Sequence, residues 1–225
     1  MSEVSSNTQI AEIVRKYSEI DDKINMTLQE AIYLSKGLAE VVDQSDFQAD
    51  YIIGIANGAL LPTHVVATEL NLPFEYIRMR RQGSRWKRRA AKVPGLRCVF
   101  SLLFRAQAFA RFVAPLIDSV NKLESEDIDE NRQPHSGRSI LLVDDAIESG
   151  QSIRAAVDML LLQGAKTVKV AVIGWSERLD SEQKHGVVPD YVLNRRLQHY
   201  PWSENNPQVH DYRSWLSDHG LEEWD

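Results

Sequence analysis

Residues 139–152 constrain the fold of this chain more than any other stretch, because a short apolar run is followed at once by two acids and a polar turn. The run Ile140 to Val143 is long enough for a buried parallel strand but too short for a helix. It stops at Asp144 and Asp145, and a Glu-Ser-Gly-Gln-Ser turn then leads into a helical pattern that begins near Ile153. This order of elements predicts an anion site at the N-terminus of a helix, with carboxylates beside it.

The chemistry of this turn predicts a ligand that carries both a phosphate and hydroxyl groups. The backbone amides of residues 148–152 and the hydroxyls of Ser149 and Ser152 would bind the phosphate. Asp144 and Asp145 would face hydroxyl groups or a metal ion, because carboxylates repel phosphate unless Mg²⁺ lies between them. A sugar phosphate meets both requirements.

The rest of the chain alternates between strand and helix patterns, which predicts an α/β fold with a mostly parallel sheet. Thr27 and Glu30 form a capping-box pattern before a helix over 28–43. The other expected elements are a helix over 8–20, a strand over 51–56, a helix up to residue 70, strands over 74–79 and 139–143, a helix over 151–163 and a strand over 167–174. Ligand sites in such sheets lie at the carboxyl ends of the strands.

The composition is that of an ordinary soluble globular protein. At 225 residues, with 43% hydrophobic and 26% charged residues, the chain fits one α/β domain with insertions. A single cysteine, Cys98, excludes internal disulfides and any multi-cysteine metal site, which suits a reducing cytoplasm. We expect neither a secretory signal nor a membrane span.

The stretch from Ile140 to Ser152 resembles the phosphoribosyl-pyrophosphate (PRPP) motif of the type I phosphoribosyltransferases. That motif has four apolar residues, two acids and two apolar residues, followed by an acid-Thr/Ser-Gly-x-Thr/Ser loop, and every position is matched in kind. The resemblance implies a parallel sheet flanked by helices, with a small C-terminal hood and a helical insertion. It also implies an Mg²⁺-dependent transfer of the 5-phosphoribosyl group from PRPP to a nitrogenous base, a purine being one candidate, with release of pyrophosphate.

The resemblance assigns roles to the residues of the motif. Asp144 and Asp145 would hold the ribose hydroxyls, directly or through Mg²⁺. Glu148 would act as general base near the acceptor nitrogen, or alternatively support the ribose site electrostatically. The residues that would bind the 5-phosphate are Ser149, Gly150, Gln151 and Ser152.

A second loop follows the strand over 51–56 and resembles the pyrophosphate loop of the family. Its residues are Ala56, Asn57, Gly58 and Ala59. Gly58 permits the backbone to approach a phosphate closely. Asn57 stands where many relatives have a cation, which removes a charge-assisted contact typically worth about 1.5–3 kcal/mol. Taken by itself, the sequence of this loop is more typical of an ordinary tight turn.

Basic residues are concentrated between Arg78 and Arg97, where nine of them occur without a single acid in a chain of net charge −6. This bias indicates an anionic ligand. In the resemblance the segment corresponds to the flexible catalytic loop, whose candidates for contact with pyrophosphate are Ser84, Arg85, Lys87 and Arg88. A solvated basic surface and a nucleic-acid site with Trp86 stacked on a base are the alternatives. The small footprint disfavours nucleic acid.

Residues 98–123 form a largely helical pattern with apolar residues on most of its faces. Such a helix is normally buried, either as a hood over the site or in a homodimer interface. Attachment to a membrane surface is the less favoured alternative. We therefore expect a homo-oligomer that does not bind membranes.

The acceptor region matches the family only in part. Residues 188–192 and 200–202 resemble elements of the xanthine/hypoxanthine-guanine branch, and the aromatic candidates for stacking on a base are Trp175, Tyr191 and Trp202. That branch commonly has a Lys shortly after the strand that ends near Gly174, whereas this chain has Trp-Ser-Glu. The difference indicates another acceptor, or a site that has lost its acceptor.

We therefore predict a single phosphoribosyltransferase-like domain over 1–225. It would comprise an N-terminal extension over 1–24, a basic and helical insertion over 80–137, and a hood and tail over 175–225. Two other classes stay open. One is a catalytically inactive module that senses PRPP or nucleotides, which Asn57 and the missing Lys favour, and the other is a nucleic-acid-binding protein that uses the basic loop.

Overall fold

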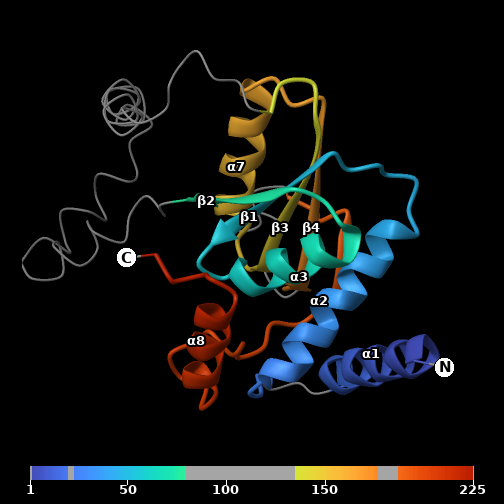
Figure 1. The fold of residues 1–225 in the computed structure, drawn as a ribbon, viewed down its shortest axis with the longest axis vertical. Coiled ribbons are helices and arrows are strands. Elements are labelled where there is room, and N and C mark those ends of the chain that lie inside the picture. Colours follow the sequence, from blue (N-terminus) through green and yellow to red (C-terminus); the bar gives the residue numbers. More distant parts are fainter. Residues whose placement is uncertain (1, 20–22, 80–134, 177–186, 225) are drawn as a thin grey trace, which may run out of the picture. The chain divides into compact units, whose positions relative to one another are not determined.

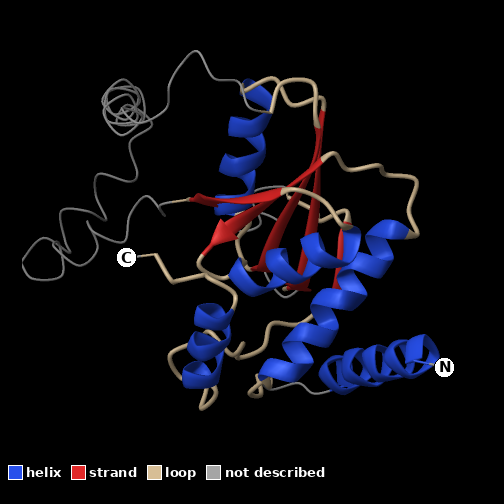
Figure 2. Ribbon diagram, viewed as in Figure 1, coloured by secondary structure: helices blue, strands red, loops and turns tan. Residues whose placement is uncertain are grey.

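A single parallel sheet organises the part of the protein that the computed structural model describes, which comprises residues 2–19, 23–79, 135–176 and 187–224. The strands lie in the order β2-β1-β3-β4-β5, and every neighbouring pair is parallel (Figures 1 and 2). Their bounds are β1 Tyr51–Ala56, β2 Phe74–Arg78, β3 Ser139–Ile147, β4 Thr167–Trp175 and β5 Tyr191–Asn194. Because all strands run the same way, their carboxyl ends share one edge of the sheet.

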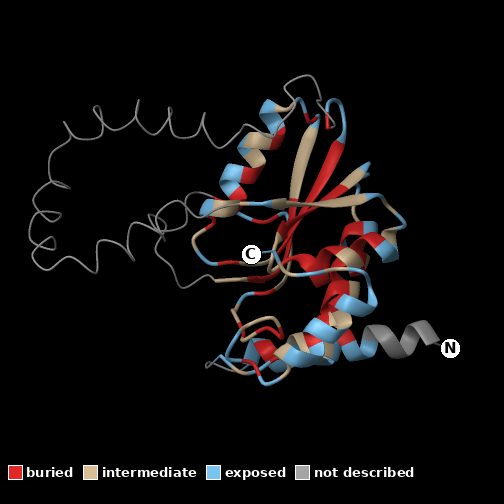
Figure 3. Cartoon of the chain, turned by 60° about the vertical axis from the view of Figure 1, so that its left-hand side comes forward, coloured by how far each residue is buried: buried red, intermediate tan, exposed pale blue. Residues whose placement is uncertain are grey.

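Helices cover both faces of the sheet, and each face has its own apolar core. One core takes in α1 (Ser2–Glu19), α2 (Leu28–Asp43), α3 (Leu60–Leu70) and α8 (Val209–Asp218), while α7 (Gln151–Leu162) packs against the other face. Side chains alternate along a strand, so Leu141 and Val143 enter the first core and Ile140 and Leu142 the second. Figure 3 shows that the central strands consist largely of buried residues.

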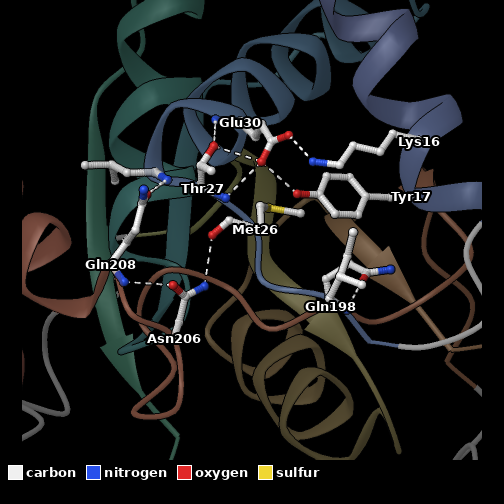
Figure 4. Close-up of polar contacts among 10 residues, drawn as sticks. Lys16, Tyr17, Met26, Thr27, Glu30, Gln198, Asn206 and Gln208 are labelled. Atoms are coloured by element: carbon white, nitrogen blue, oxygen red, sulfur yellow. Dashed lines mark hydrogen bonds and ion pairs between the residues drawn. The ribbon is translucent and has the colours of Figure 1, made fainter.

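The start of α2 is fixed by the predicted capping box. Glu30 N donates to Thr27 Oγ1 across 3.2 Å, and Thr27 N donates to Glu30 Oε2 across 2.9 Å. Glu30 also accepts hydrogen bonds from Lys16 Nζ (2.6 Å) and Tyr17 OH (2.8 Å) of α1 (Figure 4). Burial would raise the pKa of Glu30, but these hydrogen bonds outweigh it and lower the pKa to about 2. This one carboxylate therefore joins α1 to α2.

Residues 24–26, which precede α2, form hydrogen bonds with residues 199–206, which follow β5. Met26 N donates to His199 O across 2.9 Å, and His199 N donates to Ile24 O across 3.1 Å. Asn206 Nδ2 donates to Met26 O across 2.9 Å (Figure 4) and to His199 O across 2.7 Å. Residues 198–206 are thus fixed by contacts with residues far away in the sequence.

Most predicted elements are confirmed, and the main correction concerns the end of β3. The strand does not end at Val143 but continues through the acids to Ile147, because Asp144 and Ile147 still pair with Val172 and Trp175 of β4. Helix α1 begins at Ser2, before the predicted start. Neither β5 nor α8 was predicted as a regular element. The basic loop and the apolar stretch over 98–123 lie outside the described residues.

The described helices do not include one that is both apolar enough and long enough to cross a membrane.

Candidate functional site

The loop after β1 and the acids of β3 meet at the carboxyl edge of the sheet. Strands β1 and β3 are direct neighbours, with Gly54 opposite Val143. Gly58 lies so close to Asp145 that a Cβ atom at position 58 would be only 2.6 Å from Oδ2 of that carboxylate. A side chain at residue 58 would therefore collide with this carboxylate unless Asp145 moved. The sequence predicted a different reason for Gly58, the close approach of a phosphate, which stays a prediction.

Asn57, in the same loop, is engaged by a distant segment of the chain. The peptide bond between Ala56 and Asn57 is cis. Asn57 Nδ2 donates to Trp224 O across 2.8 Å, and Trp224 N donates to Asn57 Oδ1 across 2.8 Å. We call residues Leu221–Trp224 the tail segment. Both polar atoms of the Asn57 side chain thus bind the backbone of the tail segment.

The two acids differ in exposure and in their contacts. Asp144 is 9% exposed and Asp145 is half-buried. Asp145 N donates to Asp144 Oδ1 across 2.9 Å, while Trp202 Nε1 donates to Asp145 Oδ2 across 2.6 Å. The indole of Trp202 stacks on the ring of Tyr200, with 5.0 Å between centroids and 3° between planes. Asp145 is thus in a polar and aromatic environment, while the buried carboxylate of Asp144 accepts from the backbone of Asp145.

Burial of Tyr200 and the nearby carboxylates Asp145 and Asp144 raise the pKa of its hydroxyl well above the ordinary range. Tyr200 therefore stays neutral beside the acid pair, and its ring provides an uncharged support for Trp202.

The turn between β3 and α7 is left-handed at Gly150 and leads directly into the helix. Gly150 caps α7 with φ of +77°, and the helix begins without a side-chain hydrogen bond at its cap. A Cβ atom at Gly150 would lie 3.2 Å from Cβ of Val187, so the turn is crowded as well as left-handed. The first-turn amides of α7 and the positive end of its dipole face this turn. Ser149 is half-buried in it, and Glu148 is exposed.

A pocket of about 150 Å³ opens beside Glu148. The side chains around it are mainly charged or polar, and they are Lys23, Glu148, Ser176, Arg195, Arg196, Leu197 and Gln198. Ser176 N donates to Ile147 O across 3.0 Å, which fixes the ends of β4 and β3 together. The guanidinium of Arg195 lies over the ring of Trp175 at 5.0 Å. The pocket thus combines an acid, a hydroxyl and three basic residues at the carboxyl edge.

The structure brings most of the predicted site residues together but separates the three acceptor candidates. Trp202 contacts Asp145, and Trp175 lies under a residue of the pocket. Tyr191 does not line the pocket, because its hydroxyl shares a hydrogen bond of 2.9 Å with Ser45 and its ring packs against the first core. The loop candidates Ser84, Arg85, Lys87 and Arg88 lie outside the described residues.

Sequence reasoning missed most of the pocket. The overlooked residues are Lys23, Ser176, Arg195, Arg196 and Gln198. The Arg pair that follows Asn194, one residue after the apolar run over 191–193, was a usable signal for the carboxyl edge. Lys23 and Gln198 gave no such signal, because tertiary contacts alone bring them to the edge: Gln198 Oε1 accepts from Ile24 N across 2.9 Å.

The described residues contain no group of three or more His, Cys, Asp or Glu side chains that could hold a metal ion by itself. An ion at the acid pair would need ligands from water or from a bound molecule.

Comparison of folds identifies relatives in solved structures. A purine phosphoribosyltransferase from Pyrococcus horikoshii Ot3 is 19% identical with a TM-score of 0.52, covering 81% of this chain and 95% of that chain. A hypothetical protein from Neisseria gonorrhoeae with bound ppGpp is 17% identical with a TM-score of 0.55, covering 89% and 98%. A xanthine-guanine-hypoxanthine phosphoribosyltransferase from Helicobacter pylori is 14% identical with a TM-score of 0.50, covering 85% and 98%. At these identities the likeness shows the fold alone.

A search of curated proteins gave no significant match. A family model described as the phosphoribosyl transferase domain matches residues 22–208, which is well over half of the chain. The matched range includes the loop after β1, the acid pair, the α7 turn and Trp202. The chain therefore belongs to the phosphoribosyl transferase domain family and has the type I fold.

Proposed function

We propose that the protein binds PRPP with Mg²⁺ and transfers the 5-phosphoribosyl group to a nitrogenous base, releasing pyrophosphate. The observation that carries this proposal is the close approach of Gly58 to Asp145. PRPP bears a ribose between a 5-phosphate and a pyrophosphate, so a site for it needs a hydroxyl-binding group flanked by two anion-binding loops. The acid pair approaches the Gly58 loop through Asp145, and the α7 turn follows it directly in the chain, so these three elements support a site for such a ligand.

The 5-phosphate would bind in the turn before α7. The amides of the first turn and the positive end of the helix dipole favour an anion there, and the hydroxyls of Ser149 and Ser152 add donors. The left-handed conformation of Gly150 shapes this turn. The pyrophosphate would bind at Ala56 to Ala59, where Gly58 allows the backbone to come close.

The donor set of the acid pair fits Mg²⁺. Asp144 and Asp145 offer carboxylate oxygens, which are ligands that Mg²⁺ prefers, and the ion usually keeps waters and takes further ligands from substrate phosphates. The absence of a third metal-binding side chain nearby, within the described residues, agrees with such shared ligation. When bound, the ion would neutralise charge on the departing pyrophosphate.

Trp202 would act as a positioning residue for Asp145. Its indole N–H holds Oδ2 of that carboxylate across 2.6 Å, and its ring is in turn held by stacking on Tyr200. A carboxylate held on one side keeps its orientation when ligand binds, which lowers the entropy lost on binding.

The acceptor base would enter the pocket beside Glu148, whose exposed carboxylate could then take a proton from the attacking nitrogen. Purines are the first bases to examine, because two solved structures of similar fold are named as purine and xanthine-guanine-hypoxanthine phosphoribosyltransferases. The mixed charge of the pocket also supports acceptors that carry an acidic group.

A nucleotide-sensing role without catalysis is the second candidate. It is favoured by the contact of Asn57 with Trp224, which engages the proposed pyrophosphate loop with the protein's own backbone. The similar structure from Neisseria gonorrhoeae holds ppGpp, a nucleotide with pyrophosphate groups.

Release of pyrophosphate separates the two candidates. The protein would be incubated with PRPP, Mg²⁺ and one base at a time from a panel of purines and pyrimidines, with the double variant Asp144→Asn/Asp145→Asn as control. Release that depends on one base and is lost in the double variant supports the transferase. If pyrophosphate were released no faster than by the double variant with any base, the transferase would be contradicted. Tight binding of ppGpp or PRPP in calorimetry would then support a nucleotide-sensing role.

A further inference from the structure

The tail segment makes a two-point contact with Asn57 that bridges 167 positions of sequence. One hydrogen bond runs from the side chain to Trp224 O and the other from Trp224 N to the side chain, each across 2.8 Å. A primary amide that both donates to and accepts from one backbone unit fixes the position of that unit in two directions. The contact is therefore specific to the backbone of residue 224, whatever its side chain.

Two further contacts hold the tail segment in place. Leu221 N donates to Leu216 O across 2.8 Å at the end of α8, and Arg213 Nε lies 2.9 Å from Glu223 Oε2. Helix α8 itself rests on α3, where Trp215 meets His64 edge-on with 5.6 Å between ring centroids. Helix α3 begins directly after the Asn57 loop. The tail segment follows α8, so the packing of α8 on α3 also holds the tail segment near the loop.

The tail segment and a pyrophosphate group would compete for the same side-chain amide. Trp224 O already accepts from one N–H of Asn57 Nδ2, which leaves only the second N–H of that nitrogen for a phosphate oxygen. Asn57 Oδ1, held by Trp224 N, can only repel such an oxygen. Glu222, which is exposed, brings negative charge to the same segment, whereas the charge of Glu223 is paired with Arg213. Like charges disfavour an anionic ligand near the loop.

We propose that the tail segment competes with the pyrophosphate group of the ligand for Asn57, so that tight binding requires release of residues 222–224. This inference rests on the proposed function, because it takes the Asn57 loop as the pyrophosphate site. Trp224 is 38% exposed, so the contact can open without disturbing a packed core. The tail segment thus competes with the ligand inside the same protein, and it lowers the affinity for pyrophosphate while it is bound to Asn57.

Three variants test the competition. Trp224→Pro removes the backbone N–H that binds Asn57 Oδ1, while Trp224→Ala keeps both backbone groups and removes the same indole. Deletion of residues 222–225 removes the contact altogether and leaves α8, which ends at Asp218, with its Leu221 hydrogen bond. Equal melting temperatures for the variants and the unchanged protein would establish that all of them fold.

Calorimetry with inorganic pyrophosphate and Mg²⁺, and then with PRPP, gives the affinities. We expect the deletion to bind about tenfold more tightly than the unchanged protein, since both hydrogen bonds are gone, and the Pro variant also to bind more tightly, since the hydrogen bond to Asn57 Oδ1 is gone. The Ala variant should bind like the unchanged protein. Equal or weaker binding by the Pro variant and the deletion would overturn the inference while leaving the proposed function standing.

Hydrogen exchange at the Trp224 amide reads the position of the tail segment directly. In the unchanged protein, saturation with pyrophosphate and Mg²⁺ should speed exchange of this amide, because its acceptor Asn57 Oδ1 is withdrawn. Binding without faster exchange would contradict the competition. If no form of the protein bound pyrophosphate or PRPP, the proposed function and this inference would both fall.

Discussion

Trp202 donates a hydrogen bond from its indole nitrogen to Oδ2 of Asp145 across 2.6 Å, although 57 positions of sequence separate the two residues. The bond joins the region after β5 to the end of β3. Because residues 198–206 are themselves fixed by the segment before α2, the orientation of the carboxylate depends on contacts spread over much of the fold. Residues outside the loops of the candidate site therefore help to fix the orientation of Asp145.

Replacement of Trp202 by Phe should weaken the site without unfolding the protein. Phe keeps a ring that can stack on Tyr200 but cannot donate to Asp145. A hydrogen bond to a charged group is worth about 1.5–3 kcal/mol, so we expect PRPP affinity to fall by about tenfold or more. Trp215→Phe is the matched control, since Trp215 packs against His64 and His219 on α3 and α8. Equal affinities for the two variants would show that the indole bond has no role in binding.

Replacement of Gly150 by Ala should lower the stability of the protein more than replacement of Gly137 by Ala. Both residues have similar positive φ, +77° and +74°, so an Ala at either costs about 1–2 kcal/mol of conformational strain. Only at Gly150 would the new Cβ meet a neighbour, Val187 at 3.2 Å, while Gly137 has open space around it. Urea denaturation should therefore show a larger loss for Gly150→Ala, and calorimetry should show weaker PRPP binding for that variant alone. If both variants lost the same free energy of unfolding, the contact between a Cβ atom at position 150 and Val187 would not destabilise the protein.

Glu30 should make the protein more stable above pH 5 than at strongly acidic pH. Its pKa is lowered from 4.5 to about 2 in the folded state, so its contribution is complete above the unfolded value and is lost as the pH falls from 4.5 through 2. Glu30→Gln should remove that part of the acid dependence and cost about 1.5–3 kcal/mol at neutral pH.

Glu69→Gln provides the comparison for this prediction. Glu69 forms an exposed ion pair with Lys36 across 2.7 Å, and such pairs are worth about 0–1 kcal/mol. Denaturant unfolding of both variants at several pH values gives the free energies of unfolding. If Glu30→Gln kept the acid dependence of the unchanged protein, another group would have to account for it.

Local sequence signals predicted the elements of the fold well, because each depends on residues close together in the chain. The Thr27 and Glu30 pair gave the start of α2, and apolar runs gave the strands β1 to β4. The end of β3 was predicted too early for a physical reason. Backbone pairing with β4 continues past Asp144, since a ladder of N–H and C=O groups does not depend on side-chain polarity.

The site was predictable only where a motif lies on one strand and its loop. Gly58 and the acid pair were found in this way, and the fold brings them into contact. The bonds from Trp202 to Asp145 and from Asn57 to Trp224 could not be read from the sequence, because loops of no regular pattern deliver their donors. Sequence reasoning placed Trp202 with the acceptor on the strength of its aromatic ring, whereas the contact that the structure describes is made by its N–H.

Binding of PRPP to the unchanged protein and to the double variant Asp144→Asn/Asp145→Asn, in the presence of Mg²⁺, tests the central claim most directly. The variant keeps the shape of both side chains and removes their charge, and circular dichroism would confirm that it folds. We predict that isothermal titration calorimetry will show binding to the unchanged protein and an affinity at least about a hundredfold weaker in the variant, a difference of about 2.7 kcal/mol. Equal affinity in the two proteins, or no binding to either, would contradict the assignment of the acid pair as the ribose site.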